Sequence, residues 1–244
     1  TRHFAVAGMS EYGYWIISIA MAGFSFSGAA ISVFSNYFSQ KRNDFLKLIP
    51  LLLLVCAAVG YVAACANGFN PLEFQHEETW RTQSMNIFWY YLALFPVFFL
   101  AGLYTGLAFT GWSRGISLLY ACALGGSAAG AAYALVFTRF LHPFQLVGAC
   151  LPLAAAASFF GAPRRDKRIR MATLAALLAG GAMSLFASGA KLPFYKQVYP
   201  AINVAGSRVI EEAYSPAGYY MQVDSFAERY DVDLSNNYGL LKAG

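Results

Sequence analysis

Long uncharged hydrophobic runs dominate the first 190 positions of the chain. Six of them contain no Lys, Arg, Asp or Glu, and they cover residues 12–34, 48–66, 87–110, 116–137, 144–161 and 171–188. A helix that crosses a bilayer needs about 20 mostly apolar residues, whereas a membrane β-strand needs about 10 with alternating polarity. The pattern therefore predicts an all-α polytopic membrane bundle of about six spans over residues 1–190, with short loops that make neighbouring helices antiparallel.

The pattern changes after residue 190. Residues 191–207 mix aromatics, Lys and Pro, which indicates an interfacial linker. Two extended-looking runs, 208–214 and 219–225, flank Ser215-Pro216-Ala217-Gly218, whose Pro and Gly favour a turn, so a β-hairpin is predicted. An isolated hairpin is marginally stable in water. We therefore expect residues 208–244 to open a larger soluble α/β domain, and, since the chain starts at Thr1, we expect further residues at both ends.

Composition narrows the function classes. The hydrophobic fraction is 58% and the charged fraction 12%, about half of what soluble domains carry, which excludes a disordered protein and an ordinary cytosolic enzyme. The chain's net charge of +5 comes from the membrane part, residues 1–190, where 12 Lys and Arg stand against 6 Asp and Glu, whereas residues 191–244 carry 5 against 6. Because these charges sit between apolar runs, they do not form a nucleic-acid footprint, and the lipid bilayer is the expected partner.

The distribution of cations predicts orientation. The first, third and fifth loops hold nine Lys and Arg, and the second and fourth hold only Arg81 and Arg139. Loops rich in Lys and Arg stay in the cytoplasm. The odd loops are therefore expected to be cytoplasmic, which with six spans places both chain ends outside.

The fifth loop is the strongest basic patch, with Arg164, Arg165, Lys167, Arg168 and Arg170. Such a cluster beside a membrane can bind anionic lipid headgroups, or it can serve only to fix topology; the sequence leaves both open.

Two predicted spans carry small residues at spacing of four. These are Gly102 with Gly106 and Gly126 with Gly130. Small residues let helix backbones approach closely in lipid, so we expect both pairs to face a neighbouring helix, either within this chain or in another subunit or copy.

Site chemistry is sparse. The spans lack ionisable side chains and His, which weakens an ion-coupled transporter or an electron carrier. The four cysteines fall in apolar runs without metal-ligand spacing and are interpreted as small buried hydrophobes: Cys56, Cys65, Cys122 and Cys150. The loop with Glu73, His76, Glu77 and Glu78 could bind a divalent metal but is better interpreted as a solvated outer loop. No catalytic, cofactor or metal residue is assigned.

Several motifs resemble one family. Tyr195-Lys196-Gln197, Gly206-Ser207-Arg208-Val209, Tyr214-Ser215-Pro216-Ala217-Gly218, Val223-Asp224-Ser225 and Leu234-Ser235-Asn236-Asn237-Tyr238 resemble the passage from membrane to enzyme domain in bacterial spermidine synthase-like membrane proteins. Leu119-Tyr120 with the stretch from Gly126 to Gly130 resembles the family's glycine-rich span. This family fuses a multi-helix membrane module to an aminopropyltransferase-like Rossmann domain.

The resemblance implies a bacterial inner-membrane, multi-pass protein. It also implies that decarboxylated S-adenosylmethionine or a similar nucleoside binds in a domain beyond Gly244, so this chain alone is not expected to be an enzyme. Ala123 stands where the family often has Asp, and Gly218 where soluble spermidine synthases have Gln. The alternatives are a non-catalytic accessory subunit of a membrane complex and a transporter half. An external tail would argue against polyamine chemistry, whose metabolites are cytoplasmic.

Overall fold

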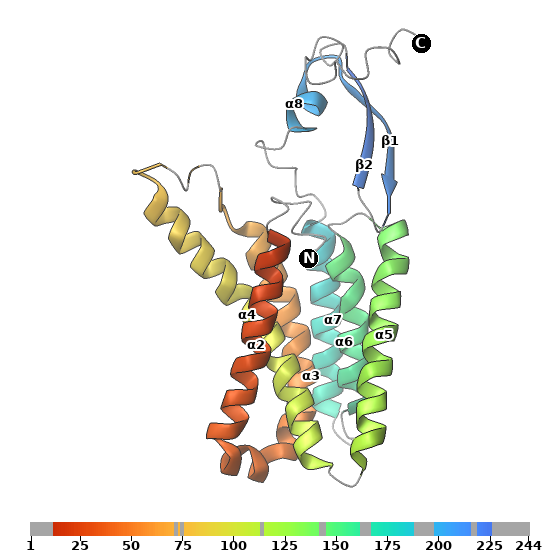
Figure 1. Ribbon diagram of the computed structural model, residues 1–244. Helices are drawn as coiled ribbons and strands as arrows, with labels where there is room; N and C mark the ends of the chain where they lie inside the picture. Colours follow the sequence, from red (N-terminus) through yellow and green to blue (C-terminus); the bar gives the residue numbers. More distant parts are fainter. Residues whose placement is uncertain are drawn as a thin grey trace.

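The computed structural model describes residues 12–70, 73, 76–112, 115–141, 145–161, 167–187, 198–215 and 219–225. These residues are mainly helical, with a small sheet near the end of the described part (Figure 1). The elements are α2 (Tyr12–Val33), α3 (Ser35–Ala66), α4 (Trp80–Gly111), α5 (Ile116–Phe140), α6 (Leu146–Gly161), α7 (Lys167–Ala187), α8 (Val198–Asn203), β1 (Arg208–Tyr214) and β2 (Tyr219–Asp224).

The helices α2 to α7 run alternately down and up one bundle (Figure 1). The helices α2, α4 and α6 end, and α3, α5 and α7 begin, at the lower end of the bundle, and the hairpin lies beyond the upper end, where α2 begins. The first, third and fifth connections therefore share one end of the molecule.

Four of these helices are long and apolar enough to cross a membrane. The spanning stretches are Gly13–Val33, Ser35–Ala66, Trp80–Gly111 and Ile116–Phe140. The helix α6 is apolar but has only 16 residues, and α7 has 21 residues with three cations in its first turn. Each of the six predicted stretches contains one of these helices, and four of them are long and apolar; the expected count of about six spans is not confirmed.

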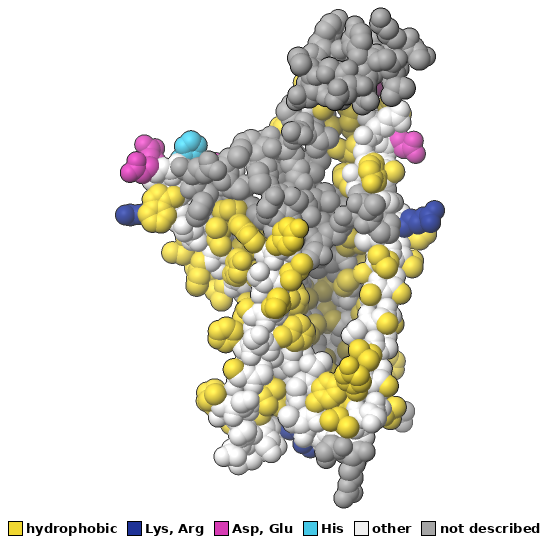
Figure 2. Space-filling view, in the orientation of Figure 1, with side chains coloured by type: hydrophobic (Ala, Val, Ile, Leu, Met, Phe, Trp, Pro, Cys, Tyr) yellow, Lys and Arg dark blue, Asp and Glu magenta, His cyan; other side chains and the backbone are white. Residues whose placement is uncertain are grey.

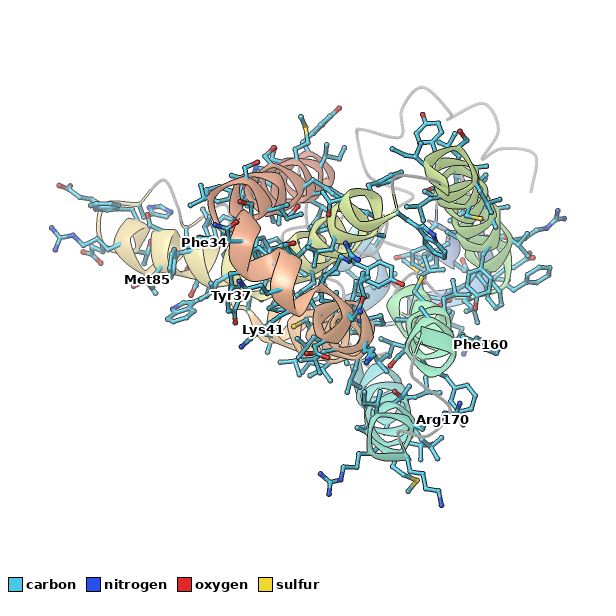
Figure 3. The ribbon with its side chains drawn as sticks, turned by 90° about the horizontal axis from the view of Figure 1, so that it is seen from below. Phe34, Tyr37, Lys41, Met85, Phe160 and Arg170 are labelled. Carbon is cyan, nitrogen blue, oxygen red and sulfur yellow. The ribbon has the colours of Figure 1, made fainter. Side chains whose placement is uncertain are left out.

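The first predicted loop is in fact helical. The helix α2 ends at Val33 and α3 begins at Ser35, so Lys41, Arg42 and Lys47 lie within α3. This segment forms a helix because its own apolar residues are buried: Phe38 packs with Ile49, Leu103 and Leu107. Seen from below, Phe34, Tyr37 and Lys41 mark a stretch that crosses the end of the bundle (Figure 3).

Helix α4 is also longer than predicted. It starts at Trp80 instead of residue 87, and it bends part-way so that its first half leans away from the bundle (Figure 1). Pro96 lies inside α4, and a proline removes a backbone hydrogen bond and kinks a helix, which accounts for the bend.

The core has three clusters along the bundle. One joins α2, α3 and α4 around Ile19 and Leu94, and the second joins α3 and α4 around Ile49 and Leu107. The third joins α3 to α6 around Leu54. Helix α5 contributes no fully buried side chain and stands at the edge of the bundle. Outside the clusters, hydrophobic side chains cover the sides of the bundle, as expected of a surface in lipid (Figure 2).

The predicted hairpin is confirmed. Strands β1 and β2 pair antiparallel, with Arg208 opposite Asp224 and Tyr214 opposite Tyr219. A bulge at Ile210 shifts the register between Val209 and Glu211. The turn residues 216–218 lie outside the described part of the chain.

Candidate functional site

The first small-residue pair lies against a neighbouring helix. A Cβ on Gly102 would collide with the Ser27 hydroxyl and would lie 2.8 Å from a ring carbon of Phe24, both on α2. A Cβ on Gly106 would collide with the side chain of Ile31, also on α2. The spacing of four therefore places two glycines on the face of α4 that packs against α2.

Three further small residues, which the sequence interpretation did not select, also lie at close helix contacts. A Cβ on Gly23 of α2 would lie 2.8 Å from the backbone nitrogen of Phe99. A Cβ on Gly60 of α3 would collide with the backbone carbonyl oxygen of Ala93. Ser27 is 2% exposed and satisfies its hydroxyl by donating to the Phe24 carbonyl at 2.7 Å. The signal was in the sequence, because Gly23 and Ser27 also have spacing of four.

The second pair is different. A Cβ on Gly126 or Gly130 would meet nothing within 4 Å among the described residues, and Gly126 is exposed on α5. Packing of this pair within the chain is therefore not found. Tyr133, seven residues after Gly126 and so on the same side of α5, reaches α6 instead: its hydroxyl donates to the Ala149 carbonyl at 2.7 Å. Contact with α6 is therefore made through this long side chain and not through the glycines.

A polar cluster joins the end of α3 to the start of α4. The Glu73 carboxylate accepts hydrogen bonds from the side-chain amides of Asn70 at 3.0 Å and Gln83 at 2.8 Å. The Gln83 carbonyl oxygen accepts from the Asn70 backbone N–H at 3.0 Å and from the Asn86 amide at 3.2 Å. Since Asn70 and Gln83 are 7% and 4% exposed, this cluster holds the connection through buried polar contacts.

The metal interpretation of this connection finds no support in its geometry. Glu73 is turned toward the amides, whereas His76, Glu77 and Glu78 are exposed before α4. Within the described ranges, no three His, Cys, Asp or Glu side chains come close enough to hold a metal ion. Figure 2 shows the acidic and His side chains of this connection projecting from the upper end of the molecule.

The basic patch of the fifth loop is only partly described. Arg164 and Arg165 lie outside the described residues, while Lys167 and Arg168 begin α7 and are exposed. Arg170 is half-buried, and its guanidinium carbon lies 4.7 Å from the centre of the Phe159 ring on α6. This cation therefore packs between α6 and α7 instead of pointing freely into solvent.

The motifs that carry the family resemblance fall at the hairpin. Gly206 has φ of +90°, a conformation that glycine adopts without strain, and it turns the chain from α8 into β1. The Ser207 hydroxyl donates a hydrogen bond to the Ser225 hydroxyl at 2.7 Å, which joins the two chain segments just outside the paired strands. The motifs 195–197 and 234–238 lie outside the described residues. Ala123, at the position where the family often has Asp, lies half-exposed on α5.

Comparison with known proteins finds no match to a family model, a curated protein or a solved structure. The structural features of the described residues are close helix contacts, a polar cluster whose groups are hydrogen-bonded, a cation between two helices and an exposed hairpin. What this arrangement does chemically is to hold helices together and to present a hairpin beyond one end of an apolar bundle.

Proposed function

We propose that this chain is a membrane-embedded module of a spermidine synthase-like protein, anchoring a nucleotide-binding, aminopropyltransferase-like domain at the surface of a bacterial inner membrane. In this proposal α2 to α7 make six crossings. The four long apolar helices of the bundle support membrane anchoring. The short α6 is compatible with a crossing because it is apolar throughout and runs alongside α3 and α7.

The single observation that carries the proposal is the hairpin beyond the end of the bundle. Three large hydrophobic residues of the two-stranded sheet, Val209, Ile210 and Tyr220, are 43%, 61% and 55% exposed. Two strands alone cannot bury such side chains, and sheets become independently stable only with more strands or a covering helix. An α/β domain that continues this sheet would supply that cover.

The membrane module itself is proposed to have no catalytic role. Aminopropyl transfer needs a nucleoside site, and such sites are built on a glycine-rich turn between a strand and a helix. The hairpin around Ser215 would supply only the edge of that site. A decarboxylated S-adenosylmethionine-like nucleoside would therefore bind in the continuing domain.

Two measurements separate anchoring from enzyme identity. For anchoring, a fluorescent protein fused after Gly244 should stay in the pellet when membranes are washed with alkaline carbonate; release into the supernatant would contradict it. For identity, the protein encoded by the complete gene should bind 5′-methylthioadenosine and aminopropylate putrescine, while residues 1–244 should do neither. A complete protein that binds no thioether nucleoside would remove the family assignment and leave anchoring intact.

One observation favours a second candidate, a non-catalytic accessory subunit of a membrane complex. No described residue covers the small-residue face of α5 at Gly126 and Gly130, and such faces let another helix approach closely. Co-purification of a stoichiometric membrane partner that Gly126→Leu releases would support it.

A further inference from the structure

The surface between α6 and α7 contains an apolar groove that ends at a cation. Its volume is about 420 Å³, within the range of small-molecule sites. The lining is mainly apolar and includes Ala155, Ala156, Phe159, Leu174 and Leu177, with Arg170 at the lower end. Figure 3 shows Phe160 and Arg170 on the two neighbouring helices at the side of the bundle.

Beside the groove, one buried hydrogen bond joins α6 to α7. The hydroxyls of Ser158 and Thr173 bond each other at 2.8 Å, and these residues are 0% and 3% exposed. The Thr173 hydroxyl also bonds the Ile169 carbonyl at 2.8 Å. The polar groups beside the groove are therefore satisfied, and an occupant meets a hydrocarbon surface.

Arg170 is the one polar residue of the groove lining whose hydrogen-bonding groups are not all satisfied among the described residues. Its guanidinium lies over the Phe159 ring, and its buried Nε has no hydrogen-bond partner among the described residues. No carboxylate in the described part of the chain forms an ion pair with it. A guanidinium stays charged and presents five N–H donors in a planar fork that matches phosphate oxygens. Among the described residues, this cation at the end of an apolar groove has no anionic partner.

We propose that this groove, the α6–α7 groove, binds one anionic phospholipid, with an acyl chain along the groove and the phosphate at Arg170. Lys167 and Arg168 lie within one turn of Arg170 on the exposed part of α7 and add positive charge at headgroup level. Arg170 and Leu177 are seven residues apart, about 10 Å along a helix. A transmembrane helix as occupant would need a seam close to the bilayer's thickness of about 30 Å, so the short groove fits a lipid chain better.

The test titrates the purified full chain with phosphatidylglycerol or phosphatidylcholine and follows bound lipid by native mass spectrometry. Wild type should bind phosphatidylglycerol about tenfold more tightly than phosphatidylcholine, because both carry a phosphodiester but the choline ammonium offsets its charge and is repelled by Arg170 and its neighbouring cations. Arg170→Gln should lower that preference. Ala156→Phe, which fills the groove, should weaken binding of both lipids. The matched controls are Arg139→Gln, an exposed cation at the opposite end of the bundle, and Leu153→Phe, an exposed α6 residue outside the groove lining; both should bind like wild type.

Equal affinity of wild type for the two lipids, or an unchanged preference in Arg170→Gln, would overturn the proposal. So would an Ala156→Phe variant that binds as wild type does. Inorganic phosphate alone should not raise the melting temperature; a rise matching that given by phosphatidylglycerol would identify a free-anion site instead. If Arg170→Gln does not fold, Arg170→Lys, which keeps the charge but loses the planar fork, should weaken the preference for phosphatidylglycerol. The comparison of Ala156→Phe with Leu153→Phe tests independently whether lipid lies in the groove.

Discussion

At the scale of single residues, the structure separates two sets of glycines that share the same sequence spacing. Gly102 and Gly106 lie against α2, whereas Gly126 and Gly130 have no neighbour within 4 Å among the described residues. A spacing of four places small residues on one face of a helix but carries no information about which face meets a partner. Helix-packing positions could therefore be proposed from sequence, but their partners came only from the fold.

The glycine contacts predict a difference between matched substitutions. Gly60→Ala and Gly102→Ala should lower the melting temperature in detergent by about 3–10 °C, because overpacking costs about 1–3 kcal/mol. The melting temperature should fall further for Gly60→Ala, because the colliding atom there is the Ala93 backbone carbonyl oxygen and not a side chain that can rotate. Gly126→Ala is the control and should leave the melting temperature unchanged or slightly raised, since alanine favours helix. Equal destabilisation by all three would contradict the packing described here.

The polar cluster around Glu73 gives a second residue-scale prediction. Gln83 both donates to Glu73 and accepts from Asn70 and Asn86, so Gln83→Leu removes the shared partner of three groups. Buried polar groups left without partners cost about 1–3 kcal/mol each. The variant should melt well below wild type, while Ser18→Ala, which loses only a bond from an exposed hydroxyl to the Tyr14 carbonyl, should not. A Gln83→Leu protein as stable as wild type would show that water replaces these bonds.

At the scale of elements, helix positions were predictable and helix ends were not. The uncharged runs located all six bundle helices because hydrophobicity marks what lies in lipid. The charged segment after Val33 was predicted as a loop, but α3 continues through it. Two contacts explain this: Phe38 is buried against Leu103, and the guanidinium of Arg42 lies over Gly111 at the C-terminal end of α4, where a cation is favourable. Neither contact is local in sequence, so no pattern within the segment could reveal it.

The first part of α3 should lie along the membrane surface. A spin label at the exposed Asn43 should be more accessible to a water-soluble nickel chelate than to oxygen, and a label at Val59, 54% exposed on the same helix, should show the opposite. Oxygen concentrates in the hydrocarbon core, which is about 30 Å thick. A label at the fully buried Leu54 should be immobile and is the control. Preferential oxygen access at Asn43 would place this segment within the bilayer.

At the scale of the whole molecule, charge and connectivity agree on which loops belong together. The first part of α3, which carries Lys41, Arg42 and Lys47, and the start of α7 lie at the lower end, and the connection with Glu77 and Glu78 lies at the upper end with the hairpin (Figure 1). The sequence could pair these loops because short connections force neighbouring helices to be antiparallel. It could not assign a substrate, because the predicted spans carry no ionisable or metal-ligating motif that would identify one.

This arrangement predicts which side of the membrane each end of the bundle faces, and one labelling experiment tests it. With all four cysteines replaced by Ala, single cysteines at Glu78 and Gln222 should react with an impermeant maleimide in intact spheroplasts, and one at Asn43 should be protected until lysis. The reason is that cation-rich ends stay in the cytoplasm. Gln222 is the better reporter of the tail because it is exposed, whereas Ser225 is 6% exposed. Reaction at Glu78 but not at Gln222 would mean that, after α4 crosses, α5 to α7 together make an even number of crossings. The tail would then be cytoplasmic, where polyamine metabolites are found. If both react, the hairpin is external, six crossings are supported, and the accessory-subunit candidate gains over the enzyme module.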